Sequence, residues 1–297
     1  MQPRQPLPAP FDRLPFTTRR ALAAGLGRGR LSGSDLAQPL RGVNLARASP
    51  LTLQRRCAAL QQRLPAHVYF SGITAASLTG VPLPSRHQLS RAVHVGVPAP
   101  HTAPTGRGVI GHQYQNPAWQ LWHGLRVSTP ARTWCELAAS LTVGELVATG
   151  DFLIHWKLPL VSQRELRALV AQSSVRRGIR KLREAVELLH DRSESAQESA
   201  LRLIMVRAGM PGLSVNLPIV TSGDFAYRAD LAFALDRVVV EYQSGYHAAP
   251  EQFRADMTRR SRLEADGWTV IELNADDLLD PLELVGRIRQ VLAARPG

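Results

Sequence analysis

The sequence predicts a multidomain protein of the α+β or α/β class. Its 297 residues are enough for two domains that each bury a core. Stretches with helical periodicity alternate with short runs of β-branched residues, which is typical of sheets packed against helices. We expect four parts along the chain, which are residues 1–48, 49–140, 141–192 and 193–297.

The charge is unevenly distributed along the chain. Lysine and arginine number 36 against 24 acidic residues, a net charge of +12. Residues 1–150 hold 16 basic and 4 acidic residues, and residues 151–297 hold 20 of each. An excess of positive charge suits a nucleic acid as partner. The alternative is a general preference for arginine, since Lys157 and Lys181 are the only lysines.

The cysteines and the hydropathy indicate the cytoplasm as the cellular compartment. Cys57 and Cys135 lie far apart without metal-ligand spacing, which favours two reduced core residues over a disulfide or a zinc site. No apolar run approaches the roughly 18 residues needed to span a bilayer, and the N-terminus lacks the apolar segment of a signal peptide. We therefore expect a cytoplasmic protein without a membrane partner.

The first part predicts two short helices and a strand. Residues 16–24 form a good helical segment with a threonine available as N-cap, residues 25–27 form a glycine turn, and residues 28–31 begin a second, basic helix. Residues 40–45 are expected to be the strand of a wing. Helix, glycine turn and basic helix is the helix-turn-helix pattern, although any small helical hairpin looks similar.

These residues resemble the winged-helix start of the AbiEi-like antitoxin family over about thirty residues. The resemblance implies a DNA-binding segment. Four arginines would then contact phosphates or base edges, which are Arg19, Arg20, Arg28 and Arg30.

Residues 49–140 predict a small α+β domain. Residues 51–64 form an amphipathic helix, residues 68–70, 91–97, 109–115 and 125–128 form strands, and a helix opens after Thr129. Five of the histidines in this part lack metal-ligand spacing, so we expect them at the surface; they are His87, His94, His101, His112 and His123.

Residues 141–192 predict a helical connector. Helices are expected over residues 142–154, 162–172 and 175–189, the second with a capping box of Ser162 and Glu165. A basic run belongs to the third helix, which is Arg176, Arg177, Arg180, Lys181 and Arg183. It is either a solvated face or a surface that follows DNA.

The last part predicts a mixed sheet flanked by helices. A helix over residues 195–208 carries Glu198 on its apolar stripe, and strands over residues 213–220 and 227–233 follow. A four-residue link leads to a strand over residues 238–243, which carries Glu241 opposite the strand of Asp230. Buried unpaired carboxylates are costly, so either an arginine or a divalent metal ion should lie between them.

Asp230 followed by Glu241, Tyr242 and Gln243 resembles the D…(D/E)xK core of the restriction-endonuclease-like nucleases. Gln243 stands where that pattern usually has lysine. The surrounding residues are similar to the C-terminal domain of actinobacterial proteins related to Vsr-type mismatch endonucleases. They are Glu198, Gly245, His247, Asp256, Arg259, Leu263 and Gly267, and the run from Thr129 to Thr133 extends the likeness.

The resemblance implies a site for Mg²⁺, or Mn²⁺, held by Asp230, Glu241 and the Tyr242 carbonyl. Glu198 would complete the shell or orient a water, and Gln243 would hydrogen-bond the water or the phosphate. His247 and Arg259 would supply the positive charge that the missing lysine would have given.

The sequence therefore predicts a metal-dependent DNA endonuclease acting in DNA repair or phage defence. The alternative is a non-catalytic antitoxin or transcriptional repressor with a degenerate nuclease fold, and an antitoxin would have a toxin partner. A third possibility is a nuclease directed at RNA. The oligomeric state stays open.

Overall fold

The structure is a computed structural model. It describes residues 6–9, 11–47, 51–88, 92–106, 108–172, 177–243 and 250–295. The chain divides into two compact units, Met1–Leu137 and Ala138–Gly297. In this part of the chain, no helix has the length and apolar character needed to cross a membrane.

The first unit begins with a three-stranded antiparallel sheet in the order β1-β3-β2, packed on two short helices. Their shared core consists of Phe11, Phe16, Ala21, Leu26, Leu31 and Leu36. The bounds are β1 Phe16–Thr17, α1 Thr18–Ala23, α2 Arg28–Leu31, β2 Leu36–Leu40 and β3 Val43–Ala46. Thr17 caps α1 by accepting a hydrogen bond from the Arg20 N–H, as its position in the sequence suggested.

The single wing strand predicted over residues 40–45 is wrong. A turn at Arg41 and Gly42 divides this segment between β2 and β3, which pair as a hairpin. Gly42 has φ of +76°, a conformation that a residue without Cβ adopts at little cost. The segment over residues 40–45 was interpreted as one strand because the turn within it requires only a single glycine.

The rest of the first unit is a five-stranded mixed sheet in the order β6-β5-β4-β8-β7. Its strands are β4 Tyr69–Phe70, β5 Val93–Pro98, β6 Val109–Tyr114, β7 Trp119–Trp122 and β8 Leu125–Ser128. Its helices are α3 Leu53–Gln61, α4 Gly72–Thr79, α5 Ser85–Gln88 and α6 Pro130–Leu137. Strand β7 was not predicted; it is an edge strand whose Trp119 and Leu121 are exposed.

The second unit begins with the three helices that the sequence predicted as a connector. They are α7 Val143–Leu153, α8 Gln163–Ala171 and α9 Ile179–Glu187. The complete capping box lies on α7, where Thr142 and Glu145 exchange hydrogen bonds. At α8 the described contacts include the Ser162 half of the predicted box, in which its hydroxyl accepts from the Glu165 N–H.

Helix α9 begins later than predicted, at Ile179, because Gly178 before it has φ of +89°. A Cβ at Gly178 would lie 2.6 Å from the Ala138 carbonyl oxygen, so only glycine fits at this position. The predicted basic helix is therefore shorter. Arg177 precedes α9, and Arg176 lies outside the described residues.

A four-stranded mixed sheet in the order β12-β11-β10-β9 forms the C-terminal part. Strands β9, β10 and β11 are an antiparallel meander, and β12 pairs with β11 in parallel. The bounds are α10 Ala196–Arg207, β9 Leu213–Val220, β10 Ala226–Phe233, β11 Val238–Tyr242, α11 Pro250–Ala265, β12 Thr269–Leu273, η1 Asp277–Leu279 and α12 Pro281–Ala293. The predicted helix and the three strands of the meander are confirmed, whereas α12 was not predicted.

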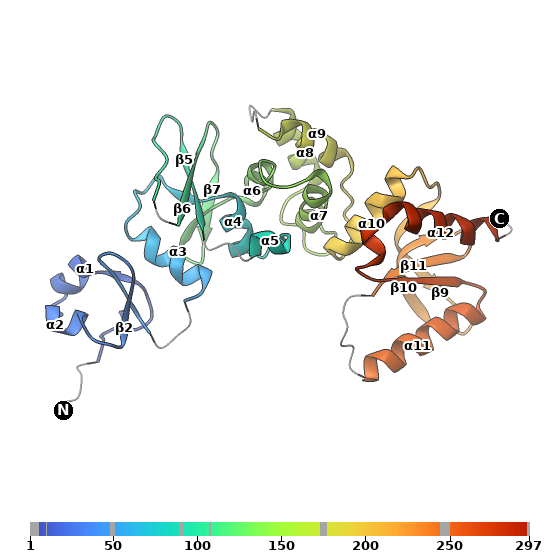
Figure 1. Ribbon diagram of the computed structural model, residues 1–297, viewed down its shortest axis with the longest axis horizontal. Helices are drawn as coiled ribbons and strands as arrows, with labels where there is room; N and C mark the ends of the chain where they lie inside the picture. Colours follow the sequence, from blue (N-terminus) through green and yellow to red (C-terminus); the bar gives the residue numbers. More distant parts are fainter. Residues whose placement is uncertain are drawn as a thin grey trace. The chain divides into compact units, whose positions relative to one another are not determined.

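Helices cover both faces of this sheet (Figure 1). Leu201 of α10 and Leu284 of α12 pack with Val238 and Val240 in one core, and Leu263 of α11 packs with Val239 in the other. The alternation of β11 therefore places Glu241 on the face that carries α11. The predicted mixture of helices and sheets is confirmed for the described chain.

Candidate functional site

Asp230 and Glu241 lie across from each other on neighbouring strands. The register of β10 and β11 pairs Leu231 with Val240. Asp230 precedes Leu231 and Glu241 follows Val240, so the two acids come directly after the last pair of this register. Oδ2 of Asp230 accepts a hydrogen bond of 3.2 Å from the Tyr242 N–H. The predicted pairing of the two strands is thus confirmed, and the meeting of the two carboxylate groups stays a prediction.

Burial dominates the electrostatics of these carboxyl groups. Removal from water raises the pKa of Glu241, and the nearby Arg259 guanidinium opposes this rise. Burial likewise raises the pKa of Asp230, opposed by the hydrogen bond from the Tyr242 N–H. Burial therefore favours the neutral form of both carboxyl groups.

Arg259 of α11 supplies one positive charge. Its Nη2 lies 3.0 Å from Oε2 of Glu241, and its Nη1 lies 2.8 Å from Oδ1 of Asp256. Among the described residues its ion pairs run to these two acids and not to Asp230. The guanidinium thus does not bridge Asp230 and Glu241, and the expectation that Arg259 lies beside the acids is confirmed.

Glu198 closes the N-terminus of α10. The helix begins after Ser195, whose hydroxyl accepts from the Glu198 N–H at 3.1 Å, and Oε2 of Glu198 accepts from the Glu194 N–H at 2.8 Å. Burial raises the pKa of Glu198, and the charge of Asp230 adds to this rise. Glu198 is therefore close enough to Asp230 to interact electrostatically, while its described bonds serve the helix end.

The remaining predicted site residues are less constrained. The Gln243 N–H donates to the Leu273 carbonyl at 2.7 Å, which continues the pairing of β11 with β12. Tyr242 is held through its N–H on Asp230. His247 lies outside the described residues.

A distorted backbone lies beside Asp230. The register of β9 and β10 sets Asn216 opposite Asp230, and Asn216 has φ of +52° inside the strand. Its buried side-chain amide donates to the Arg192 carbonyl. A non-glycine residue in this conformation stores strain, which is frequent at functional sites.

Sequence reasoning missed a group of cations around Trp156. Arg192, Lys157 and Arg228 place their charges 4.7, 5.2 and 5.6 Å from the centre of its ring. Glu194 pairs with Lys157 at 2.7 Å and with Arg228 at 2.9 Å. Arg228 precedes Asp230 by two residues on the same strand, and this position was the feature of the sequence that could have indicated the group.

One feature of these residues favours a bound cation, and another disfavours it. Oε1 of Glu241 is buried and has no hydrogen-bond partner among the described residues, which is the condition of a carboxylate oxygen that awaits a ligand. Within the described ranges no group of three or more His, Cys, Asp or Glu side chains could hold a metal ion. Two carboxylates with a main-chain carbonyl and waters are a set that Mg²⁺ accepts.

The four N-terminal arginines separate into two kinds. Arg30 donates two hydrogen bonds to Asp35 at 3.0 and 2.7 Å, so its guanidinium has a structural partner. Arg19, Arg20 and Arg28 are exposed, with Arg20 also lying 5.8 Å from the centre of the Phe11 ring. These three carry the expectation of DNA contact.

The predicted surface histidines are only partly at the surface. His94 and His112 are half-buried, and their Nδ1 and Nε2 atoms lie 3.0 Å apart. The expectation for the cysteines is confirmed, since Cys57 and Cys135 are buried and free.

The chain is thus a mixed α+β protein whose C-terminal sheet carries Asp230 and Glu241 on two paired strands. It is similar to Uncharacterized protein Rv2248 of Mycobacterium tuberculosis (strain ATCC 25618 / H37Rv), with 32% identity over 239 residues that cover 80% of this chain and 86% of the relative. The same values hold for Uncharacterized protein MT2308 of Mycobacterium tuberculosis (strain CDC 1551 / Oshkosh). The chain belongs to the family of these two mycobacterial proteins. No family model and no solved structure matches it.

Proposed function

We propose that the chain is a Mg²⁺-dependent endonuclease that hydrolyses phosphodiester bonds in DNA. The observation that supports this most is the pair of acids, Asp230 and Glu241, together with the unpartnered buried oxygen of Glu241. An unpaired buried carboxylate costs free energy. A divalent cation bound to these acids would therefore stabilise the folded chain.

The chain's own residues would divide the work. Asp230 and Glu241 would hold Mg²⁺ or Mn²⁺ with the Tyr242 carbonyl, and the ion when bound supplies Lewis-acid polarisation of the phosphate and of a water. Gln243, just beyond β11, would hydrogen-bond that water or the phosphate. Arg259, fixed on Glu241 at 3.0 Å, provides positive charge near the position where the nuclease pattern usually has lysine.

Plasmid nicking in the presence of Mg²⁺ tests the proposal. We expect Asp230→Ala and Glu241→Gln to lower the rate more than about a hundredfold, since metal-ion catalysis contributes several kcal/mol and each 1.4 kcal/mol is tenfold. Glu184→Gln is the matched control, because Glu184 pairs with Arg207 at the surface, away from β11. Cleavage that both site variants retain would exclude this site as its source.

The second candidate is a non-catalytic DNA-binding protein, either an antitoxin with a toxin partner or a transcriptional repressor. The ion pair of Arg259 with Glu241 favours it, because an arginine already neutralises one of the two acids. This candidate predicts DNA binding that needs no metal and that Asp230→Ala leaves unchanged. Parallel assays on duplex DNA and single-stranded RNA separate both candidates from a nuclease directed at RNA.

A further inference from the structure

A second polar group lies in the first unit, far in sequence from the paired acids. One face of the five-stranded sheet carries the apolar core of Val93, Val95 and Val97. The other face carries polar and aromatic side chains from three strands and from α6. We call these side chains the tyrosine–histidine cluster, and they are Tyr69, His94, His112, Tyr114, Arg132 and Glu136.

The sheet register assembles the cluster. Tyr69 of β4 is paired with Gly96 of β5, and Gly96 is paired with His112 of β6. A Cβ at Gly96 would lie 2.5 Å from Cζ of Tyr69 and 2.7 Å from its hydroxyl oxygen. The tyrosine ring therefore lies across β5 in space that only glycine leaves open.

Aromatic contacts connect the members of the cluster. The rings of His94 and His112 stack with centres 5.2 Å apart, and Tyr114 lies 6.1 Å from His112 and 6.4 Å from Tyr69. Tyr69 is fully buried, whereas His94, His112 and Tyr114 are half-buried. The cluster thus runs from the interior toward solvent.

Glu136 of α6 has one structural oxygen and one that the fold leaves unused. Its Oε2 accepts from the Gly72 N–H at 2.8 Å and from the Ser128 hydroxyl at 2.7 Å. Its Oε1 is buried without a hydrogen-bond partner among the described residues. The charge of Glu136 acts on both Tyr69 and Tyr114, so the carboxyl group belongs to the same cluster.

Two further members also have unpartnered polar atoms. The Tyr69 hydroxyl and Nε of Arg132 are buried and make no hydrogen bond within the described ranges. Buried polar atoms are nearly always satisfied in folded proteins, because an unmade hydrogen bond costs free energy. Three such atoms within one cluster are therefore open to a partner from outside the chain.

We propose that the tyrosine–histidine cluster is a binding site for a small organic anion that carries an oxyanion together with a hydrogen-bond donor. The Arg132 N–H and the Tyr69 hydroxyl would donate to the oxyanion, and Oε1 of Glu136 would accept from the donor. The half-buried rings of Tyr114 and His112 would flank the ligand. Sugar phosphates and free amino acids share this chemistry.

Isothermal titration calorimetry on the full chain tests this site, with ribose 5-phosphate and L-serine as the two probes. We expect one of them to bind at least about tenfold more tightly than inorganic phosphate or ribose, which each offer only half of the required chemistry. Which probe binds identifies the source of the oxyanion. Failure of both probes to bind would overturn the proposal.

Tyr69→Phe is the decisive variant, since it removes a hydroxyl that has no partner in the fold and so should leave the melting temperature unchanged. We expect it to weaken binding of the effective probe about tenfold, the value of one lost hydrogen bond. Tyr227→Phe, on the C-terminal sheet, should have no effect. An unchanged affinity in Tyr69→Phe would place binding elsewhere and reject the cluster as the site.

Discussion

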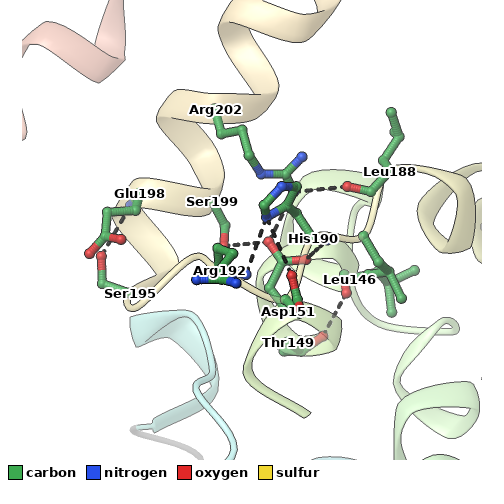
Figure 2. Close-up of polar contacts among 12 residues, drawn as sticks. Leu146, Thr149, Asp151, Leu188, His190, Arg192, Ser195, Glu198, Ser199 and Arg202 are labelled. Atoms are coloured by element: carbon green, nitrogen blue, oxygen red, sulfur yellow. Dashed lines mark hydrogen bonds and ion pairs between the residues drawn. The ribbon is translucent and has the colours of Figure 1, made fainter. Parts of the chain in front are cut away.

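Asp151 shows how a single side chain holds the second unit together. Its Oδ1 accepts from the His190 N–H at 2.7 Å, and its Oδ2 accepts from the Ser199 hydroxyl at 2.7 Å and from Arg202 Nη2 at 2.9 Å (Figure 2). This network joins α7 to α10, and Figure 2 shows Glu198 pointing away from it. The buried carboxylate is tolerated because both of its oxygens accept hydrogen bonds and one of them is paired with a guanidinium.

Removing the carboxylate should unfold the network. We expect Asp151→Ala to lower the free energy of unfolding by about 3–5 kcal/mol, because the buried Arg202 charge loses its carboxylate and keeps only the Leu188 carbonyl. Glu184→Ala removes the half-exposed pair with Arg207 and should cost less than about 1 kcal/mol. Urea unfolding of both variants measures the difference, and equal losses would contradict a special role for Asp151.

The pKa of Glu136 gives a second prediction at the scale of one residue. Burial raises this pKa from 4.5 to about 7, so the folded state binds the proton more tightly than the unfolded state. The stabilisation from this group is therefore complete below pH 4.5 and is lost as the pH rises through 7.

We expect wild type to lose about 3 kcal/mol more than Glu136→Gln between about pH 4.5 and about pH 7, at 1.36 kcal/mol for each pKa unit. Comparing the two proteins removes the contribution of other groups, among them His94, whose lowered pKa acts in the opposite direction. Urea unfolding across this pH range measures the effect. Parallel pH profiles would show that Glu136 keeps its ordinary pKa.

At the scale of elements, β9 changes the face on which its odd-numbered residues lie. Leu213 and Val215 pack in the core of α10 and α12, whereas Leu217 and Ile219 pack in the core of α11. Strict alternation would keep all four on one face. The positive φ of Asn216 between them reverses the alternation next to Asp230.

Two substitutions at Asn216 separate its backbone from its side chain. Both Asn216→Gly and Asn216→Val remove the hydrogen bond to the Arg192 carbonyl, but only glycine adopts φ of +52° without strain. We expect valine to be less stable than glycine by about 1–3 kcal/mol in thermal or urea unfolding. Equal stabilities would mean that the backbone relaxes at this position.

At the scale of the whole molecule, positive charge is concentrated in the first 150 residues, with 16 basic against 4 acidic residues. Most of a protein's affinity for DNA comes from counterion release, so this half should set the salt dependence of binding. Arg19, Arg20 and Arg28 are the exposed candidates in the first sheet and its helices.

Replacing Arg19, Arg20 and Arg28 with serine together should reduce the slope of log affinity against log salt by about 2–3, at roughly 0.9 per phosphate contact. The control replaces Arg164, Arg167 and Arg207, which removes the same charge from exposed positions of the second unit. Fluorescence anisotropy with duplex DNA over a range of salt concentrations measures both slopes. An equal change in the two sets would show that only net charge matters.

The sequence by itself determined the order of elements and the pairing of the strand of Asp230 with the strand of Glu241. A short link between two β-branched strands leaves one antiparallel pairing, so the distance between these acids is a local consequence of the chain. Thr17 and Thr142 likewise cap their helices, each by accepting a hydrogen bond from the backbone N–H three residues later in the sequence.

Only the tertiary structure decided what those acids touch. Arg259 reaches Glu241 across 18 residues, Arg30 is paired with Asp35, and the unpartnered atoms of the tyrosine–histidine cluster come from separate strands and a helix. The left-handed Asn216 was equally invisible in an apolar strand pattern. Such contacts depend on how distant segments pack, and periodicity records only which face of its own element a residue occupies.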